Sequence, residues 1–403
     1  MFPKLRFKEF DENWKEVTLK NCITSIDSGW SPQCESYPAN SSEWGVLKTT
    51  SVDWSGFNSS FNKKLPLELT PRKEIEVKPL DILVTRAGPT ERVGVVSVVP
   101  HSVRSKLMIS DKLIRLKSNE ENNPLFLGIS LSSVKCQNQL QSKTSGLAKS
   151  QTNISQKILG EVLLKLPSKE EQTKIASFLS AVDEKISQLT KKHELLSQYK
   201  QGMMQKLFSQ QLRFKADDGS EFREWEEKEL KDIAEINPKS KKLPESFIYI
   251  DLESVEKGQL LLQKNIELQD APSRAQRLLA KGDVLFQMVR PYQQNNYYFN
   301  LSGEYVASTG YAQIRTKLDS KFIYYALHEK TFLDEVMNRC TGTSYPAINS
   351  SDLSSIEILI PCLEEQTKIA NVLSAIDQKI EVISKQIEQA KQWKKGLLQQ
   401  MFI

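Results

Sequence analysis

The chain has 403 residues, of which 39% are hydrophobic and 26% charged, and its formal net charge is +5. This composition is that of an ordinary globular protein of two or three domains. The charge is far below that of a protein that coats nucleic acid non-specifically. No apolar run approaches the roughly 18 residues of a membrane span, and residues 1–7 lack the apolar core of a signal peptide.

The cysteines and histidines do not suggest a metal site. Five cysteines are scattered along the chain without a C-x-x-C pair, and the three histidines lie in three different segments. We therefore expect a reducing, cytoplasmic location, with neither structural zinc nor a disulfide framework.

In chain order, residues 1–165 come first and carry a net charge of +6; we call them the first head. Apolar runs bounded by turn residues predict its strands, and an apolar run after a turn predicts a helix. The predicted strands are 45–50, 80–86, 93–99 and 112–116, and the predicted helix is 126–134.

A long helix follows at residues 166–210, and the chain contains its sequence twice. Glu-Glu-Gln-Thr-Lys-Ile-Ala at 170–176 recurs unchanged at 364–370, an offset of 194 residues. In the first copy Ser168 precedes a glutamate by three residues, as in a capping box. In the second copy Cys362 replaces that serine, so we expect a weaker cap.

Between the two copies lie residues 211–359, the second head, with a net charge of −4. Faint echoes of the first head include Leu-Arg-Phe followed by a tryptophan, and a turn with aspartate before an apolar strand. Strands are predicted at 247–252, 284–289 and 305–315, and a helix at 321–337. The second long helix, residues 360–403, ends the chain.

Apolar residues in both long helices alternate spacings of four and three, which is typical of a coiled coil. Polar interruptions fall at His193 and at the equivalent pair Lys200 and Lys394. We predict an antiparallel pair of helices with one α/β head at each end, an α+β fold overall. The predicted seam residues are Ile175, Leu179, Val182, Ile186, Leu189, Leu196, Met203, Ile369, Leu373, Ile376, Ile380, Ile383, Ile387 and Leu397.

Two fragments resemble catalytic motifs. Residues 123–126, Asn-Pro-Leu-Phe, resemble the N-P-P-[FYW] tetrapeptide of adenine methyltransferases but lack its second proline, and a turn that starts a helix explains them better. Asp251 and Glu253 resemble a nuclease metal pair without its lysine, and a solvated strand end is the better interpretation. Phosphate-loop, H-E-x-x-H and G-x-S-x-G sequences are absent. We therefore predict no catalytic residues and no metal ligands.

Polar loops at strand ends are the candidates for DNA binding. Arginine, glutamine and asparagine contact base edges, whereas lysine, serine and threonine contact phosphates. The loop at residues 287–296, rich in amides, is the strongest candidate. The predicted DNA-binding residues are Thr85, Arg86, Lys143, Ser145, Lys149 and Gln151 in the first head, and Gln287, Arg290, Tyr292, Gln293, Asn295, Thr343, Ser344 and Tyr345 in the second.

The whole chain resembles a specificity subunit of a type I restriction–modification system. The resemblance rests on the duplicated Pro-x-x-Glu-Glu-Gln-x-x-Ile-Ala sequence from Pro167 and Pro361, its Leu-Ser-Ala-[Val/Ile]-Asp continuation, and the Leu-Arg-Phe opening of each head.

This resemblance implies that each head recognises one half of a split, asymmetric DNA target. It implies that the long helices dock two methyltransferase subunits and that restriction (translocase–nuclease) subunits join the complex. S-adenosylmethionine, ATP and Mg²⁺ would be bound by those partners, with no cofactor on this chain. The alternatives are a stand-alone DNA methyltransferase or nuclease, or a coiled-coil structural adaptor.

Overall fold

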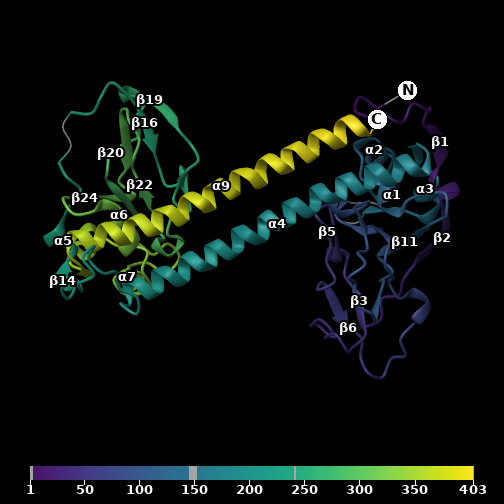
Figure 1. Cartoon of the computed structure of the whole chain (residues 1–403), viewed down its shortest axis with the longest axis horizontal. Helices are drawn as coiled ribbons and strands as arrows, with labels where there is room; N and C mark the ends of the chain where they lie inside the picture. The colour runs from purple at the N-terminus through teal and green to yellow at the C-terminus, as the bar shows by residue number, and fades with distance from the viewer. Residues whose placement is uncertain (1–2, 145–151, 240–241, 403) are drawn as a thin grey trace. The chain divides into compact units, whose positions relative to one another are not determined.

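The computed structural model describes residues 3–144, 152–239 and 242–402. It divides into two compact units: residues 1–189 with 386–403, and residues 190–385. Each unit holds one head and a segment of both long helices, α4 (Lys169–Phe208) and α9 (Leu363–Met401) (Figure 1). The two long helices predicted from the repeat are therefore confirmed. The predicted domain division at residues 165, 210 and 359 stays a prediction.

The first head is built on a four-stranded antiparallel sheet in the order β2-β11-β7-β9, with a smaller sheet β10-β3-β6 and three two-stranded pairs, β1-β13, β12-β8 and β4-β5. The strands are β1 (Lys15–Thr18), β2 (Ile23–Ser28), β3 (Gly45–Leu47), β4 (Val52–Asp53), β5 (Gly56–Phe57), β6 (Asn62–Lys64), β7 (Ile82–Thr85), β8 (Ala87–Gly88), β9 (Val96–Val98), β10 (Leu107–Met108), β11 (Leu113–Ser118), β12 (Thr152–Asn153) and β13 (Leu163–Leu166). The helices are α1 (Pro124–Leu131), α2 (Val134–Gln141) and α3 (Gln156–Gly160), with 3₁₀ turns η1 (Leu19–Cys22), η2 (Thr49–Ser51), η3 (Lys73–Ile75) and η4 (Thr90–Arg92).

The second head has two four-stranded sheets, β15-β24-β21-β22 and β19-β16-β23-β20, with the pairs β14-β25 and β17-β18. Its strands are β14 (Glu226–Glu229), β15 (Ala234–Ile236), β16 (Ser246–Ile250), β17 (Val255–Glu256), β18 (Gln259–Leu260), β19 (Lys264–Glu267), β20 (Ala275–Leu278), β21 (Val284–Gln287), β22 (Tyr297–Tyr298), β23 (Tyr305–Ser308), β24 (Tyr311–Thr316) and β25 (Glu357–Ile360). The helices are α5 (Leu230–Ile233), α6 (Ser320–Ala326), α7 (Lys330–Asn338) and α8 (Ser350–Ser354), with turns η5 (Leu268–Asp270) and η6 (Pro291–Gln293).

Three predicted elements were wrong in extent. The strand predicted at 305–315 is two strands in different sheets, because the chain leaves β23 at Thr309 and enters β24 after Gly310. The helix predicted at 321–337 breaks after Ala326, because the Glu329 carboxylate accepts from Thr331 N and Phe332 N and caps a new helix. In the first head, the Ser133 side chain caps α2 in the same way and ends the helix predicted at 126–134.

Both fragments that resembled catalytic motifs have the structures expected of turns. The Asn123 side chain accepts from Leu125 N at 3.0 Å and Phe126 N at 3.1 Å, and Pro124 begins α1. Such a cap with proline at the first position is a common helix start. Asp251 follows β16, and its carboxylate accepts from Glu253 N and the Ser254 hydroxyl. Each fragment therefore has a local role.

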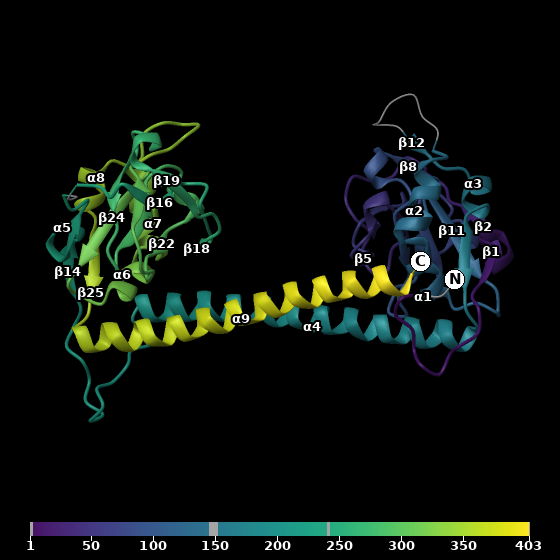
Figure 2. The ribbon, with the colours of Figure 1, turned by 90° about the horizontal axis from the view of Figure 1, so that it is seen from above.

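Each head shares its hydrophobic core with the long helices of its own unit, and in Figure 2 the sheets of each head lie on one side of those helices. In the first unit, Val84 and Phe126 belong to the same cluster as Ile175 of α4 and Leu397 of α9. In the second, Phe286 and Phe322 cluster with Ile369 of α9. A helix with a long apolar stripe is stable only when tertiary packing covers that stripe, so head and helices stabilise one another.

In each long helix, the second glutamate of the repeat binds the first residues of the adjoining head. In the first unit, the Glu171 side chain is buried; Arg6 donates to both of its oxygens at 2.7 Å, and Trp14 Nε1 lies 3.4 Å from Oε1. In the second unit, Glu365 accepts from Arg213 at 2.9 and 3.2 Å and from Trp225 at 3.1 Å. We call each arginine–tryptophan–glutamate group a carboxylate anchor.

The glutamine that follows this glutamate in the repeat also binds the adjoining head. Gln172 donates to Pro167 O at 3.0 Å and accepts from Asn123 N, the N-cap of α1, at 3.0 Å. Gln366 donates to Pro361 O at 2.8 Å and accepts from Asp319 N, the N-cap of α6, at 3.2 Å. Both glutamines are buried. The Glu-Glu-Gln sequence thus joins a long helix to the opening and to the first helix of its head.

The predicted capping box forms only in part. Glu171 N lies 3.4 Å from the Ser168 hydroxyl, which gives a long cap contact. The Glu171 side chain binds Arg6 and Trp14, whereas a capping box directs it to the backbone of the cap residue. The anchor therefore takes the carboxylate that the sequence pattern assigned to the cap.

Within each unit, α4 and α9 pair with opposite chain directions (Figures 1 and 2). In the first unit Asp183 of α4 and Lys394 of α9 form an ion pair at 2.5 Å, and in the second Lys200 and Asp377 form the equivalent pair at 2.6 Å. These aspartates end the repeated Leu-Ser-Ala-[Val/Ile]-Asp sequence. The lysines that interrupt the apolar spacing thus each have a partner. The predicted seam residues are all buried or half-buried.

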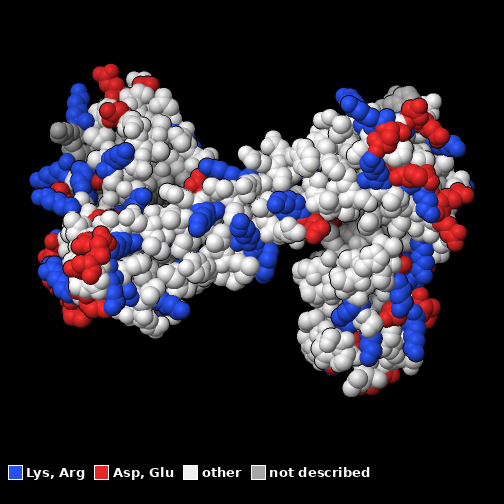
Figure 3. Space-filling view, in the orientation of Figure 1, with Lys and Arg blue, Asp and Glu red and all other residues white. Residues whose placement is uncertain are grey.

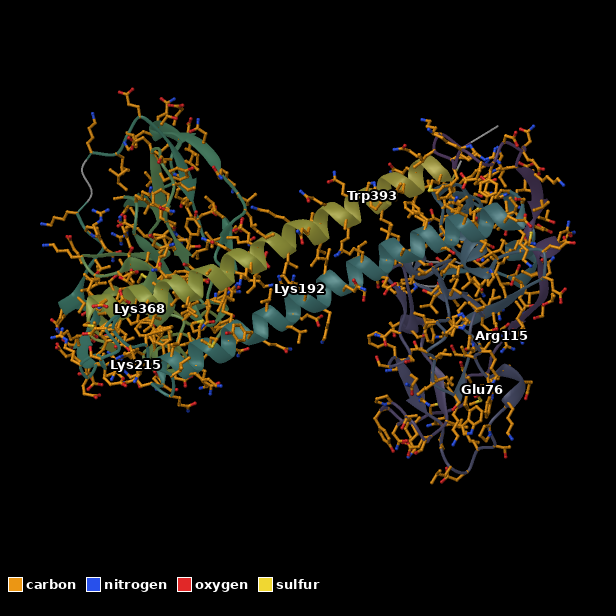
Figure 4. All side chains as sticks on the ribbon, viewed as in Figure 1. Glu76, Arg115, Lys192, Lys215, Lys368 and Trp393 are labelled. Carbon is orange, nitrogen blue, oxygen red and sulfur yellow. The ribbon has the colours of Figure 1, made fainter. Side chains whose placement is uncertain are left out.

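The turn before the central strand of each head is also repeated. Lys78 N donates to Asp81 at 2.8 Å, and Ala280 N donates to Asp283 at 2.7 Å. Asp81 is buried, and this burial raises the pKa of its carboxyl. Arg115 lies 3.7 Å from Asp81 and also donates to Glu76 O at 2.8 Å; Figure 4 labels Glu76 and Arg115. The turn and the arginine thus fix the start of β7.

None of the helices in the described ranges combines the length and the apolar character needed to cross a bilayer.

The carboxylate anchor gives a stability prediction. Replacing Glu171 by Gln removes the charge that Arg6 binds, and we expect the free energy of unfolding to fall by about 1.5–3 kcal/mol. Urea denaturation measures the change. Glu170→Gln alters the exposed neighbour and should stay within about 0.5 kcal/mol of the wild type. Equal losses in the two variants would contradict a specific anchor.

Candidate nucleic-acid interface

The loop after β21 in the second head is organised by Gln287, which is only 2% exposed. Its amide nitrogen donates to Val289 O at 2.8 Å and to the Gln293 side chain at 2.9 Å, and its amide oxygen accepts from Asn295 N at 3.0 Å. Arg290 and Gln294 on either side of η6 have positive φ values of 54° and 51°. The hydrogen bonds of the Gln287 side chain therefore stabilise a loop in which two residues have a left-handed backbone conformation. Residues other than glycine rarely adopt this conformation.

A second polar loop joins this one. Val289 bridges to Ala347, and Arg290 N donates to Pro346 O at 2.7 Å. The Arg290 guanidinium lies over the Tyr345 ring, 4.3 Å from its centroid. The structure thus brings together two predicted loops that lie about fifty residues apart in the chain.

The exposed side chains of these loops suit nucleic acid. Tyr345 is 63% exposed and Tyr292 51% exposed, while Thr343 and Ser344 are also exposed. The Arg290 guanidinium has the Tyr345 ring as its contact and forms no ion pair with a carboxylate among the described residues. Aromatic rings beside an unpaired arginine and hydroxyl groups offer stacking, base-edge and phosphate contacts on one surface.

Other members of the predicted set hold the loop in place. Asn295 accepts from Lys257 N at 3.0 Å and so ties the loop to the β17–β18 turn. The neighbouring Asn296, which lies in the predicted loop but not among the predicted contact residues, accepts from Gln287 N at 2.8 Å, and its Nδ2 lies 3.4 Å from Nε2 of the half-buried His328. Burial lowers the pKa of His328 to about 4, so its ring is neutral at pH 7. The sequence pattern did not identify His328 as a part of this site.

The first head has the corresponding arrangement at the end of β7. Thr85 is fully buried, and its hydroxyl accepts from Val95 N at 2.9 Å, so it supports the strand end. Arg86 follows, half-buried, and Ile154 N donates to Arg86 O at 3.0 Å. The same backbone contact joins Ile348 N to Met288 O at 3.1 Å in the second head. The two heads therefore place their candidate loops at equivalent strand ends.

The remaining candidates of the first head precede β12 in the chain. Lys143 is exposed and lies 4.0 Å from Glu161. Ser145, Lys149 and Gln151 lie outside the described residues. β12, which follows them in the chain, pairs with β8 at Ala87 and Gly88.

Charge on the visible face of each head is mixed. Figure 3 shows acidic and basic side chains interspersed on both heads, without a surface of a single sign in that view. Local groups such as Arg290, more than net charge, would therefore attract a nucleic acid.

A prediction follows for the Arg290–Tyr345 contact. If these residues contact bases, Arg290→Ala or Tyr345→Ala should weaken binding to the cognate duplex by about 1–3 kcal/mol, measured by fluorescence anisotropy. Tyr345→Phe keeps the ring under the guanidinium and serves as the control. The same loss on a duplex of scrambled sequence would show that these residues do not read bases.

Comparison with known proteins agrees with this organisation. The family model for the type I restriction modification DNA specificity domain matches residues 12–197 and 223–392. The chain is 40% identical over 171 residues to the EcoEI specificity subunit of Escherichia coli, a match that covers 42% of this chain and 29% of that protein. It is 27% identical over 414 residues to the putative MjaX specificity subunit of Methanocaldococcus jannaschii, covering 98% of this chain and 94% of that protein.

A solved structure shares the fold. The S subunit of a type I restriction–modification system from M. genitalium superposes with a TM-score of 0.66 at 17% identity and covers 100% of this chain and 99% of its own. The two family-model matches span both heads and most of both long helices. The chain belongs to the family of type I restriction–modification specificity subunits, with two copies of the DNA specificity domain.

Proposed function

We propose that this chain is the DNA-reading subunit of a type I complex, in which each head recognises one half of a bipartite, asymmetric target. The observation that carries this proposal is that both heads place polar loops at equivalent strand ends but fill them with different residues. Arg86 in the first head and Met288 in the second occupy matching positions, defined by the same backbone contact. Two similar scaffolds with dissimilar loops suit two different half-sites.

The proposed role on this chain is non-catalytic. The relatives with matching sequences are named as specificity subunits, and the fragments that resembled catalytic motifs have structural roles. Incubation of the purified chain with duplex DNA and S-adenosylmethionine, or with Mg²⁺, tests this. Methyl transfer or cleavage without partners would support a stand-alone enzyme instead.

The proposed partners are two methyltransferase subunits on the long helices, with restriction subunits completing the complex. S-adenosylmethionine, ATP and Mg²⁺ would then act on those subunits. Large apolar side chains that are more than half exposed on the long helices support such docking. Leu195 and Tyr199 of α4 are 52% and 55% exposed, and Val382 and Trp393 of α9 are 55% and 54% exposed. A cytoplasmic location fits the cysteines, all of which are free thiols.

Mapping of methylated adenines tests the function directly. In cells that carry this chain with its methyltransferase partners, methylation should appear at a split target with one specific sequence on each side of an unread spacer. Exchange of residues 284–349, which include both second-head loops, for those of a relative should change only one half-site. A change in both halves, or in neither, would contradict one head per half-site.

Helix length should set the spacer between the half-sites, which gives a further prediction. Insertion between residues 189 and 190 of α4 and between 387 and 388 of α9 falls between the two ion pairs in sequence and leaves the residues of both pairs unchanged. Seven residues inserted at both places lengthen each helix by about 10.5 Å. At 3.4 Å per base pair, the preferred spacer should grow by about 3 bp.

The same methylation mapping measures the spacer, and an insertion in α4 alone is the matched control. If the complex that carries both insertions still methylates targets with the original spacer, helix length does not set the spacing.

A further inference from the structure

A pocket of about 380 Å³ opens in the first head, outside the loops predicted to bind DNA. Four separate segments form it: the connection after β2, the end of β3 with η2, strand β6, and the turn before β11. Its polar lining includes Ser31, Lys48, Thr49, Thr50, Lys63 and Lys112.

The three lysines of this pocket are not neutralised. None of them has an ion pair with a carboxylate in the part of the chain that the structure describes, whereas Lys64, the next residue after Lys63, pairs with Glu43 at 2.7 Å. Successive side chains of a strand point to opposite faces, so β6 places one lysine in the pocket and the next against Glu43. Asp111, which stands between Ser110 and Lys112 in the chain, is hydrogen-bonded to Ser31 of the lining.

The pocket adjoins the candidate interface of the first head. Arg86 N donates to Lys112 O at 2.8 Å, and Leu113 pairs with Thr85 in the sheet. Lys112, which precedes β11, therefore lies beside Arg86, which follows β7, at the same end of the sheet. DNA bound at Arg86 would therefore also lie beside Lys112, the lysine that joins the pocket to the interface.

The lining selects for phosphate over bases. Besides Pro32, Cys34, Val46 and Leu47, it contains lysine, serine and threonine side chains but no arginine, asparagine or glutamine. Lysine and hydroxyl groups position the sugar–phosphate backbone, whereas arginine and the amides recognise base edges. In addition, no hydrogen bond to the Thr49 or Thr50 hydroxyl is present within the described ranges, so both remain available to an anionic oxygen.

We propose that this pocket holds a phosphate of the DNA backbone and anchors the first head on its half-site without regard to sequence. This rests on the proposed function, which supplies the phosphodiester. The second head has Gly310 where the first has Lys112, as shown by the bond from Met288 N to Gly310 O at 3.0 Å. The lysine that borders the interface is thus specific to the first head, which carries a net charge of +6 against −4 for the second.

The salt dependence of binding tests the proposal. The full chain is titrated, with its methyltransferase partners, against the cognate duplex and a scrambled one between 50 and 200 mM salt. Lys63→Ala and Lys112→Ala should each reduce the slope of log K against log salt by about one, and weaken binding to both duplexes equally. Lys64→Ala, with the same nominal charge change, should leave the slope unchanged. Unchanged slopes for Lys63→Ala and Lys112→Ala would overturn the pocket's assignment.

Two further measurements separate the possible explanations. Melting temperatures equal to that of the wild type exclude unfolding of the variants. Titration of the DNA-free chain with inorganic phosphate, followed by calorimetry, tests a free anion as the occupant: phosphate binding lost in Lys112→Ala, without a change in the DNA slope, would reject the DNA backbone. A wild-type complex that binds no duplex at all would instead refute the proposed function.

Discussion

A buried carboxylate holds each head to its helix. Glu171 and Glu365 are almost wholly inaccessible to solvent, and each accepts hydrogen bonds from an arginine and a tryptophan contributed by the opening of the adjoining head. Removal of one partner of a buried ion pair leaves an uncompensated charge, so neither glutamate nor arginine can change alone without loss of stability. This constraint explains why the same short sequence recurs in both helices.

The carboxylate anchors do not constrain the edges of the heads that carry the candidate loops, after β7 in the first head and after β21 in the second. Loop residues at those edges follow a strand end fixed by backbone hydrogen bonds, and their side chains do not contribute to the anchor. In the second head the loops form an internally bonded surface around Gln287, with Arg290 packed on Tyr345. In the first head the corresponding edge carries Arg86 and, beside it, the lysine pocket. A common scaffold thus supports two surfaces of different chemistry.

Much of the scaffold could be predicted from the sequence. The repeat located both long helices, and the alternating apolar spacing identified residues that are buried or half-buried. The polar interruptions at Lys200 and Lys394 pair with Asp377 and Asp183, the aspartates of the repeat, but spacing within one helix could not show which side chain lies opposite. The wrong extents had local causes: the chain changes sheets at Gly310, and Glu329 starts a new helix.

Less of the candidate site was predictable. Thr85 and Gln287 stand at strand ends as expected, but both are buried and bond to their own loops, which composition alone does not reveal. The Arg290–Tyr345 contact and the three lysines of the pocket join segments far apart in the chain. Only tertiary structure assembles such groups, because no period of a helix or strand relates their positions.

The matched ion pairs along α4 and α9 have a consequence for how such a chain changes. Asp183 and Lys200 of one helix have the same chemistry and spacing as Asp377 and Lys394 of the other, so each helix presents the partner that the other requires. Replacement of the sequence between the two repeated segments would leave the residues of these pairs unchanged. A chain of this form could therefore take a new second head by exchange of a single block, while the two helices keep their ion pairs.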